Sequence, residues 1–584
     1  MEAAYPAGEP EYYRSRRVTD RPPEGKGRLG PFSVVCLVLN RTIGSGIFVT
    51  PALVLSGTGT VGASLLLWAF GGLVATCGLL VWLELGLSLP LLPTGDDQQK
   101  RPVPRSGGEK NYLEFIYRRP STDDLDQPKP RYLVRCMYGI AFVTLGNLSG
   151  NAIALGIYAM NAAGYSDPKG AHVVGIAIGA LTLAVLIHLF SRRGGIIINN
   201  CFAVLKVMLL LAIFAIGMVK ASGYNLGSAP KTTYNFDTDN SFATPKHDVG
   251  SYSNSFLFIV YTYSGFEQPF YVLAEVKRPR KVFPKYTLLA MAIATGLFLL
   301  VNIAYFCAVP SDSAEVVERR NMAVVFFGQV FGAEVAKRVM AAVIAVSIFG
   351  NILVMTFTAS RVKQEIAKEG ILPFSLTFAT STTTPLGWWQ KRHRQLEKGE
   401  YLDQTPMAAL GLHWFTSVFL VCVTAGLKPA VAYSVLISLY SYTIIILIGF
   451  FTSAGLVYLH ARTSLRWQPS FSPPGRWLYA AIYATVCLFM LFASFVPPQA
   501  GSPWSYEKTG VLWYLIPTIG LSVPFWGMVW YFGLRLVMAY KGMNLVITRV
   551  PVTEPDGDEW VTISEHISQE WHVPTNVGNT VEMK

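Results

Sequence analysis

The chain has 584 residues, of which 52% are hydrophobic and only 14% are charged. Soluble globular proteins carry about 25% charged residues, so the composition excludes an ordinary soluble domain and indicates a membrane protein. The formal net charge of +12 does not indicate nucleic-acid binding, because the basic residues gather in loops between apolar stretches.

Twelve apolar stretches are long enough to cross a bilayer as helices, which takes about 20 residues each. They cover about 32–57, 62–89, 132–162, 171–190, 196–220, 252–275, 286–309, 336–362, 406–427, 431–459, 477–497 and 511–538. The loops between them are too short for a second globular domain. We therefore predict one all-α integral membrane domain over residues 32–538, with tails at 1–31 and 539–584.

The basic loop residues indicate the orientation of the helices. Cytoplasmic loops carry an excess of Lys and Arg, and such residues here precede the first stretch and follow the fourth, sixth and eighth. They include Arg28, Arg192, Arg193, Lys277, Arg278, Lys391 and Arg392. The loop at 221–250 lies on the other side and carries Asp237 and Asp239. This pattern predicts that both tails are cytoplasmic.

The first stretch is interrupted by Thr42-Ile43-Gly44-Ser45-Gly46. Lipid offers no partner to backbone N–H and C=O groups, so spanning helices pair these groups internally. A Gly-Ser-Gly sequence in mid-span favours a break, which is tolerated only where it is buried or lines a cavity. Many secondary transporters hold small charged substrates at such breaks.

The sixth stretch carries a second interruption, Tyr261-Thr262-Tyr263-Ser264-Gly265, followed by Pro269. Proline removes a backbone donor and clashes with the preceding turn, so a break is expected here as well. A lone Gly pair in a membrane helix more often reflects helix packing. Two breaks five stretches apart instead indicate the two halves of an inverted repeat.

The two breaks together predict a binding site for an α-amino acid. The N–H groups of Ser45 and Gly46, at the positive start of a half-helix, suit a carboxylate. The freed carbonyl groups of Thr42 and of residues 261–264 suit an ammonium group, and Tyr261 and Tyr263 are placed to close over the ligand. The candidate substrate-binding residues are Thr42, Ile43, Gly44, Ser45, Gly46, Tyr261, Thr262, Tyr263, Ser264 and Gly265.

Motifs for other chemistry are missing from the sequence. It contains no G-x-x-x-x-G-K-[ST], no H-E-x-x-H and no G-x-S-x-G, which are signatures of nucleotide, zinc and nucleophile sites. The seven cysteines lie in or beside apolar stretches without C-x-x-C spacing, as small packing residues do. We expect no enzyme activity, no metal and no cofactor.

Further motifs occur in a fixed order along the chain. They are Gly44-Ser45-Gly46-Ile47-Phe48, Glu84-Leu85-Gly86, the string from Ser106 to Glu114, Ala359-Ser360-Arg361, and Glu369-Gly370-Ile371-Leu372-Pro373. As a set, over about residues 30–540, they resemble the amino acid–polyamine–organocation (APC) superfamily and its L-type amino acid transporter branch. Asn40-Arg41 and the Ser106–Glu114 string also resemble fungal high-affinity methionine permeases, although Phe266 stands where those usually carry Trp.

This resemblance implies a leucine-transporter-like fold of about twelve helices, with a five-plus-five inverted repeat and broken helices one and six. It implies import of neutral L-amino acids, methionine foremost, across the plasma membrane by alternating access with proton symport. Tyr261 takes the place of the gating aromatic residue. Animal members are tied to a glycoprotein subunit by a cysteine after the third helix. Residues 161–172 contain none, so no obligatory glycoprotein subunit is expected.

Three charged residues fall at membrane depth, where a functional role is the default hypothesis. A lysine at the position of Lys206 can replace the sodium ion of sodium-coupled relatives and support the first broken helix; the alternative is a lysine that snorkels to the surface. Arg41 precedes the first break and Glu267 follows the second, so we hypothesise a direct or water-bridged pair. Alternatively, Arg41 faces a cytoplasm-connected cavity and Glu267 pairs elsewhere.

Two other functions fit the same motifs. An exchanger of broader neutral specificity would share the site, and a non-transporting nutrient receptor would keep it and signal through its tails. The tails are short and the gate residues are present, which favours transport. The C-terminal tail is expected to be plain solvated chain, and the 91–105 loop, rich in polar residues and Pro, is expected to be irregular.

Overall fold

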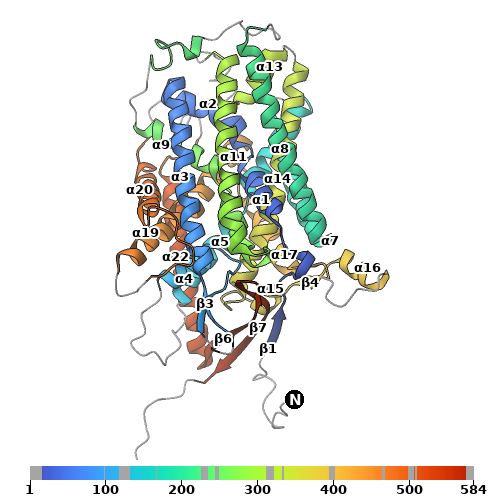
Figure 1. Cartoon of the computed structure of the whole chain (residues 1–584). Coiled ribbons are helices and arrows are strands. Elements are labelled where there is room, and N and C mark those ends of the chain that lie inside the picture. The colour runs from blue at the N-terminus through green and yellow to red at the C-terminus, as the bar shows by residue number, and fades with distance from the viewer. Residues whose placement is uncertain are drawn as a thin grey trace, which may run out of the picture.

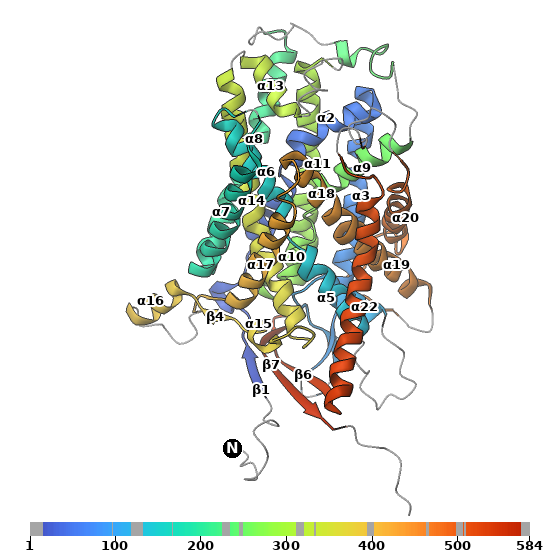
Figure 2. The same ribbon diagram turned by 180° about the vertical axis from the view of Figure 1, so that it is seen from behind.

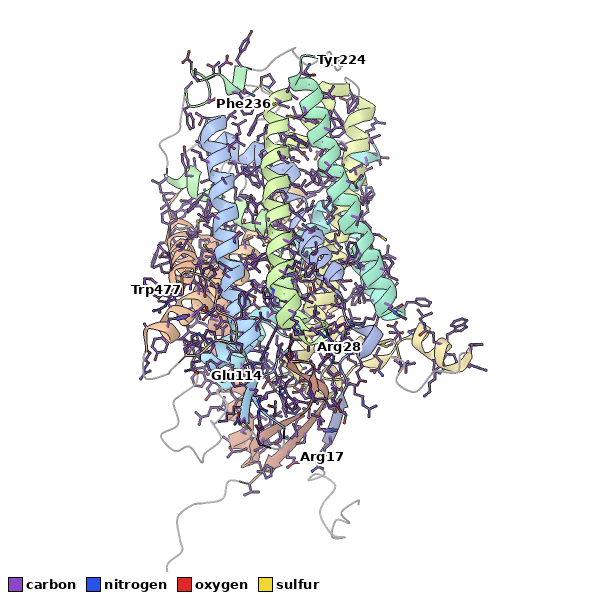
Figure 3. The ribbon with its side chains drawn as sticks, in the orientation of Figure 1. Arg17, Arg28, Glu114, Tyr224, Phe236 and Trp477 are labelled. Atoms are coloured by element: carbon purple, nitrogen blue, oxygen red, sulfur yellow. The ribbon has the colours of Figure 1, made fainter. Side chains whose placement is uncertain are left out.

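The computed structural model of the chain describes residues 16–95, 97, 99–117, 132–165, 167–224, 234–243, 249–310, 321–331, 334–393, 402–462, 467–497, 506 and 510–573. Figure 1 and Figure 2 show a bundle of long helices with a small sheet at one end. In Figure 3, Arg17 marks the end with the sheet, and Tyr224 and Phe236 mark the opposite end.

The helices follow one another with short connections. The first ten are α1 (Pro31–Thr42), α2 (Gly46–Thr58), α3 (Val61–Ser88), α4 (Glu109–Ile116), α5 (Tyr132–Leu145), α6 (Ser149–Ala162), α7 (Gly170–Phe190), α8 (Arg192–Ala221), α9 (Val249–Tyr263) and α10 (Gln268–Tyr271). The later ones are α11 (Pro279–Ala308), α13 (Met322–Phe331), α14 (Glu334–Ala367), α15 (Ser375–Phe378), α16 (Pro385–His393), α17 (Met407–Val423), α18 (Pro429–Tyr440), the π-helix η5 (Ser441–Leu447), α19 (Ile448–Ala461), α20 (Leu478–Ala493) and α22 (Leu515–Lys541).

The membrane part of the chain is helical, as predicted. Within the described residues, eight segments are long and apolar enough to cross a bilayer, and the bent pair α1–α2 makes a ninth. Helices α17 and α20 are apolar but shorter. Helices occupy all twelve predicted stretches, but length and hydropathy support up to nine spans. The count of twelve and the inverted repeat therefore stay predictions.

The spans differ in how much of their surface other helices cover. The span formed by α5 and α6 has 83% of its apolar window buried, whereas α8 and α22 have 28% and 22%. Apolar residues that remain exposed on such helices are suited to contact with lipid chains. The α5–α6 span therefore lies in the centre of the bundle, and α8 and α22 lie at its periphery.

The two tails meet in a three-stranded antiparallel sheet. β1 (Arg16–Asp20) pairs with β7 (Glu559–His572), which pairs with β6 (Asn544–Asp556). The expectation of a plain solvated C-terminal chain is therefore wrong. The 91–105 loop also differs from expectation, because β2 (Leu91–Thr94) and β3 (Gln99–Pro102) form an antiparallel pair. A third pair joins β4 (Thr382–Thr383) and β5 (Gln404–Thr405).

Buried ion pairs fasten this sheet to the ends of the helices. Arg549 on β6 and Lys368, just after α14, have side chains only 9% and 4% exposed, and each contacts several carboxylates. Burial of ions stabilises a structure only when every charge is well paired. The pairs are Arg549–Glu365 (2.8 Å), Arg549–Glu565 (2.8 Å), Arg549–Glu369, Lys368–Asp20 (2.8 Å), Lys368–Glu365 (2.6 Å), Lys368–Glu565 (3.1 Å) and Arg105–Glu565 (2.7 Å).

Removal of Arg549 should destabilise the protein strongly. An Arg549→Met substitution leaves Glu365, Glu369 and Glu565 buried with fewer positive partners, and loss of one partner from a buried ion pair costs about 3–5 kcal/mol. The variant should therefore unfold at a clearly lower temperature than the unchanged protein. Thermal unfolding of the purified protein in detergent, followed by intrinsic fluorescence, measures the difference.

Lys281→Met is the matched control for that experiment. The Lys281–Asp558 pair joins α11 to the turn of the same sheet at 2.9 Å, but its side chains are 62% and 82% exposed. Exposed pairs contribute little to stability because water screens them, so this variant should unfold close to the temperature of the unchanged protein. An equal drop in unfolding temperature in both variants would contradict the view that the buried ion pairs stabilise the protein more than the exposed pair does.

Candidate functional site

The first span is broken where the sequence predicts it. α1 ends at Thr42, α2 begins at Gly46, and the two helices are bent by 44°. Among the described residues, no backbone acceptor pairs with the N–H groups of Gly44 and Ser45. Gly46 opens α2, where first-turn N–H groups lack an intrahelical partner. Because Ile43 and Ser45 are fully buried, the partial positive charge of these groups lies inside the protein.

The sixth stretch is broken between α9 and α10. The carbonyl of Tyr261 accepts hydrogen bonds from the N–H of Ser264 at 3.1 Å and from its hydroxyl at 2.6 Å. Gly265 has a φ of +141°, a conformation that glycine adopts without steric cost. Its N–H donates to a carboxylate oxygen of Glu267 at 2.8 Å. The break is thus held by its own polar groups.

The two breaks face each other at close range. A Cβ atom added to Gly46 would lie 2.4 Å from Oγ1 of Thr262. A Cβ atom added to Gly265 would lie 2.4 Å from Oγ1 of Thr42. Oγ1 of Thr50, one turn into α2, lies 3.1 Å from Oγ1 of Thr262. Only glycine allows the two segments to approach so closely, so the structure brings the two predicted halves of the site together.

Tyr261 and Tyr263 point to different sides of α9. The hydroxyl of Tyr261 donates to Oδ1 of Asn151 on α6 at 2.5 Å. The hydroxyl of Tyr263 donates to the carbonyl of Trp68 at 3.1 Å, and its ring packs against Trp68 and Phe298. Tyr263 therefore contributes to packing between α9, α3 and α11, and it does not close over the site as the sequence suggested.

A cavity of about 710 Å³ lies beside the site. Its walls include residues of α2, α6, α9, α13, α14 and α18, and Figure 1 places α2 and α13 at the end of the bundle away from the sheet. Val49 and Leu53 line it from α2, and Phe258 lines it from α9. Tyr433 lines it from α18, and its hydroxyl lies 3.2 Å from Oγ of Ser45. Tyr433 therefore lies between the cavity and the first break, and none of residues 42–46 and 261–265 lines the cavity.

Lys206 connects three helices behind the first break. Its ammonium group donates to the carbonyl of Asn40 on α1 at 2.6 Å and to Oδ1 of Asn351 on α14 at 2.5 Å. The side chain is 1% exposed, so it does not snorkel to the surface. Gly350 allows this approach, because a Cβ atom there would lie 3.1 Å from Nζ of Lys206.

Arg41 is held by aromatic rings. Its guanidinium carbon lies 5.7 Å from the ring centres of both Tyr261 and Tyr440, a distance at which cation–π attraction is significant. Among the described residues no direct ion pair joins Arg41 to Glu267, which accepts from Gly265 and from the Gln268 amide at 3.0 Å. Arg41 is only 2% exposed, so it does not open to the cytoplasm either. The surroundings of Arg41 therefore match neither a direct ion pair with Glu267 nor a position open to a cytoplasm-connected cavity.

Four residues around the breaks were not predicted from the sequence: Asn151, Asn351, Tyr433 and Tyr440. The two asparagines carry a signal that could have found them, because polar side chains in a spanning helix require partners and are often functional. The two tyrosines lie on α18 in a segment rich in aliphatic and hydroxyl residues. No motif there distinguishes them from aromatic residues that only pack.

Comparisons with known proteins agree with this architecture. A family described as amino acid permease matches residues 29–522. The high-affinity methionine permease of Saccharomyces cerevisiae is 29% identical over 516 residues, which are 87% of this chain and 79% of the relative. The low-affinity methionine permease of the same yeast is 32% identical over 363 residues (61% and 60%). The b(0,+)-type amino acid transporter 1 of Homo sapiens is 28% identical over 345 residues (59% and 63%). The chain belongs to the amino acid permease family, as an integral membrane protein of amino acid transport.

Proposed function

We propose that this permease imports neutral L-amino acids, methionine foremost, across the plasma membrane by proton-coupled alternating access. The observation that carries the proposal is the pair of facing breaks, which only the side chain of Tyr433 separates from the cavity. An α-amino acid has one anionic and one cationic end, and the two breaks offer polar backbone groups of both kinds within a short distance. The names of the two yeast relatives favour methionine.

Substrate binding uses the two ends of the broken helices. The carboxylate accepts hydrogen bonds from the N–H groups of Ser45 and Gly46, where the positive end of α2 adds to the attraction. The ammonium group donates to carbonyl groups at Thr42 and in the second break, near Ser264. The substrate side chain then extends toward Tyr433 and the apolar wall of the cavity. Tyr261 acts as the gate, anchored by its hydrogen bond to Asn151.

The conformation of the structure fits one state of alternating access. The cavity opens at the end of the bundle away from the sheet, and the buried ion pairs close the end that carries the sheet. With both tails in the cytoplasm, as the basic loops predict, this state faces outward. Import then requires the cavity to close and the end with the sheet to open, a rearrangement typical of transporters with broken helices.

The charge behind the first break bears on which ion drives transport. Lys206 already supplies a positive charge behind the first break and contacts the carbonyl of Asn40, a place where sodium-coupled relatives hold a sodium ion. A second cation at the same place would be repelled, so we propose coupling to protons rather than to sodium. The chain is proposed to work without an obligatory glycoprotein subunit.

Uptake of radiolabelled L-methionine by permease-deficient yeast cells that express the chain tests the proposal. Uptake should saturate, should be stronger at an external pH of about 5 than at about 7.5, and should be unchanged when choline replaces sodium. Unlabelled methionine should compete. If only larger neutral amino acids compete, the substrate is a larger neutral amino acid and not methionine. If uptake requires amino acid inside the cell, the protein is an exchanger. Surface expression without any uptake would favour a receptor.

A Gly46→Ala substitution should abolish uptake. The new methyl group would meet Oγ1 of Thr262 at 2.4 Å, so the two breaks would be forced apart and the donors at the first break displaced. The loss should exceed tenfold, since the substrate contacts on both breaks must form together. Gly175→Ala on α7 is the matched control, because nothing lies within 4 Å of a Cβ atom there. Normal uptake by the Gly46 variant would count against the site.

A Lys206→Met substitution should also abolish uptake while the protein still reaches the membrane. It removes the donor that satisfies the carbonyl of Asn40 and the amide of Asn351, and a buried acceptor without a partner costs about 1–3 kcal/mol. The exposed Lys277→Met variant should transport normally. Uptake that persists in the Lys206 variant and becomes sodium-dependent would support the sodium-replacement role in particular.

A further inference from the structure

Glu109 is a buried carboxyl group surrounded by neutral donors. It begins α4 and is 2% exposed. One oxygen accepts from Nε1 of Trp82 at 3.0 Å and from the hydroxyl of Tyr271 at 3.1 Å, and the other accepts from the hydroxyl of Tyr138 at 3.1 Å. The neighbouring Lys110 turns away to contact Glu369. None of the ion pairs of the described residues includes Glu109.

This carboxyl is linked directly to the second half of the broken sixth helix. Tyr271 is the last residue of α10, and its carbonyl accepts a hydrogen bond from the N–H of Gly107 at 3.3 Å. Gly108 packs on the same tyrosine, since a Cβ atom there would lie 2.8 Å from a ring carbon. Any tilt of α10 must therefore change the surroundings of Glu109.

Burial and one nearby carboxylate favour the neutral form of Glu109. α4 lies outside the spanning helices, and burial, together with the like charge of Glu267, raises the pKa of Glu109 to about 7. The hydrogen bonds from neighbouring donors oppose this shift. The other titratable groups near Glu109 are Tyr112 on α4, Tyr138 on α5, Tyr271 on α10 and Tyr483 on α20.

We propose that Glu109 carries the coupled proton in the transport cycle, an inference that rests on the proposed proton-coupled import. In the closed arrangement of Trp82, Tyr138 and Tyr271, one carboxylate oxygen forms an O–H bond with a proton that a hydronium ion from the outer side gives up, leaving water. Movement of α10 during inward opening withdraws Tyr271 and admits water to the carboxyl. Hydration favours the ionised form, so the O–H bond breaks and the proton leaves to the cytoplasmic side.

This arrangement couples the proton to the conformation by simple linkage. The closed cluster binds a proton more tightly than the hydrated one, so a proton stabilises the closed cluster and its release accompanies opening. One carboxyl yields one proton per cycle. Because Tyr271 belongs to the helix that forms the second break, substrate binding and proton binding act on the same moving element.

The test uses the purified full chain in proteoliposomes. Methionine uptake driven by a proton gradient, methionine-driven proton entry reported by an internal pH dye, and methionine–methionine counterflow are measured together. For the unchanged protein, a group with a pKa of about 7 predicts that uptake falls about tenfold from pH 6 to pH 8. In Glu109→Gln, uptake should become independent of pH and proton entry should vanish, while counterflow continues.

Glu114→Gln is the matched control, because it changes the other acid of α4, which is 27% exposed and contacts Arg135. It should keep both pH dependence and proton entry. If the unchanged protein shows no counterflow, the proposed function fails. If it transports without proton entry, proton coupling fails and the role of Glu109 fails with it. If it is proton-coupled and Glu109→Gln still moves protons with methionine, the assignment of Glu109 alone is overturned.

Tyr138→Phe keeps the inference testable if Glu109→Gln does not fold. The substitution removes one donor from the ionised carboxylate, which disfavours the charged form and raises the pKa of Glu109. The midpoint of the pH dependence of uptake should therefore move upward by about one pH unit. A midpoint that stays in place or moves downward would overturn the assignment, because a purely structural tyrosine would change the rate and not the midpoint.

Discussion

This architecture depends on one constraint: two helices are broken inside the bundle, and the backbone groups freed at each break need partners. An unpaired polar group in lipid costs several kcal/mol, so each break must be enclosed by partners. Glu267 satisfies the N–H of Gly265, and Lys206 satisfies the carbonyl of Asn40. The N–H of Gly44 has no backbone partner among the described residues. The surrounding helices therefore enclose the breaks and leave donors near the cavity, on the far side of Tyr433.

The sequence predicts the parts of this site whose signals are local. Glycine and proline in an apolar stretch act on their own backbone, so the positions of both breaks, near Gly46 and Gly265, could be read directly. The spacing of the two breaks also indicated that they face each other, and the close approach of Gly46 to Thr262 agrees with this. The direction of a single side chain is less local, which is why Tyr263 was misplaced: side chains two positions apart on a helix do not share a face.

Features that depend on contacts between distant segments could not be predicted in this way. The sheet joins β1 to strands more than 500 positions later, and no periodicity reports such pairing. A local signal for β6 was present, since Val546, Thr548, Val550 and Val552 alternate along it, but the charges of the tail concealed it. Arg41 presents the same difficulty. The sequence suggests an acidic partner for a buried cation, whereas Tyr440, about 400 positions away, supplies a ring.

The end of the bundle with the sheet is closed and the other end is open, and the two ends are lined by different kinds of side chain. At the end with the sheet, Arg549 and Lys368 are buried among carboxylates, so opening must hydrate several charges at once. At the other end, the cavity is lined by apolar side chains such as Val49, Leu53 and Phe258, and also by polar ones such as Asn254 and Asn321. In the proposed cycle the apolar side chains close on the substrate. An ionic closure opens when water can reach its charges, while an apolar closure forms when water leaves. A ligand that binds between them shifts the balance only by its differential affinity for the two states. If transport follows the proposed cycle, the free energy needed to separate the buried ions is therefore the least that substrate and driving ion together must supply.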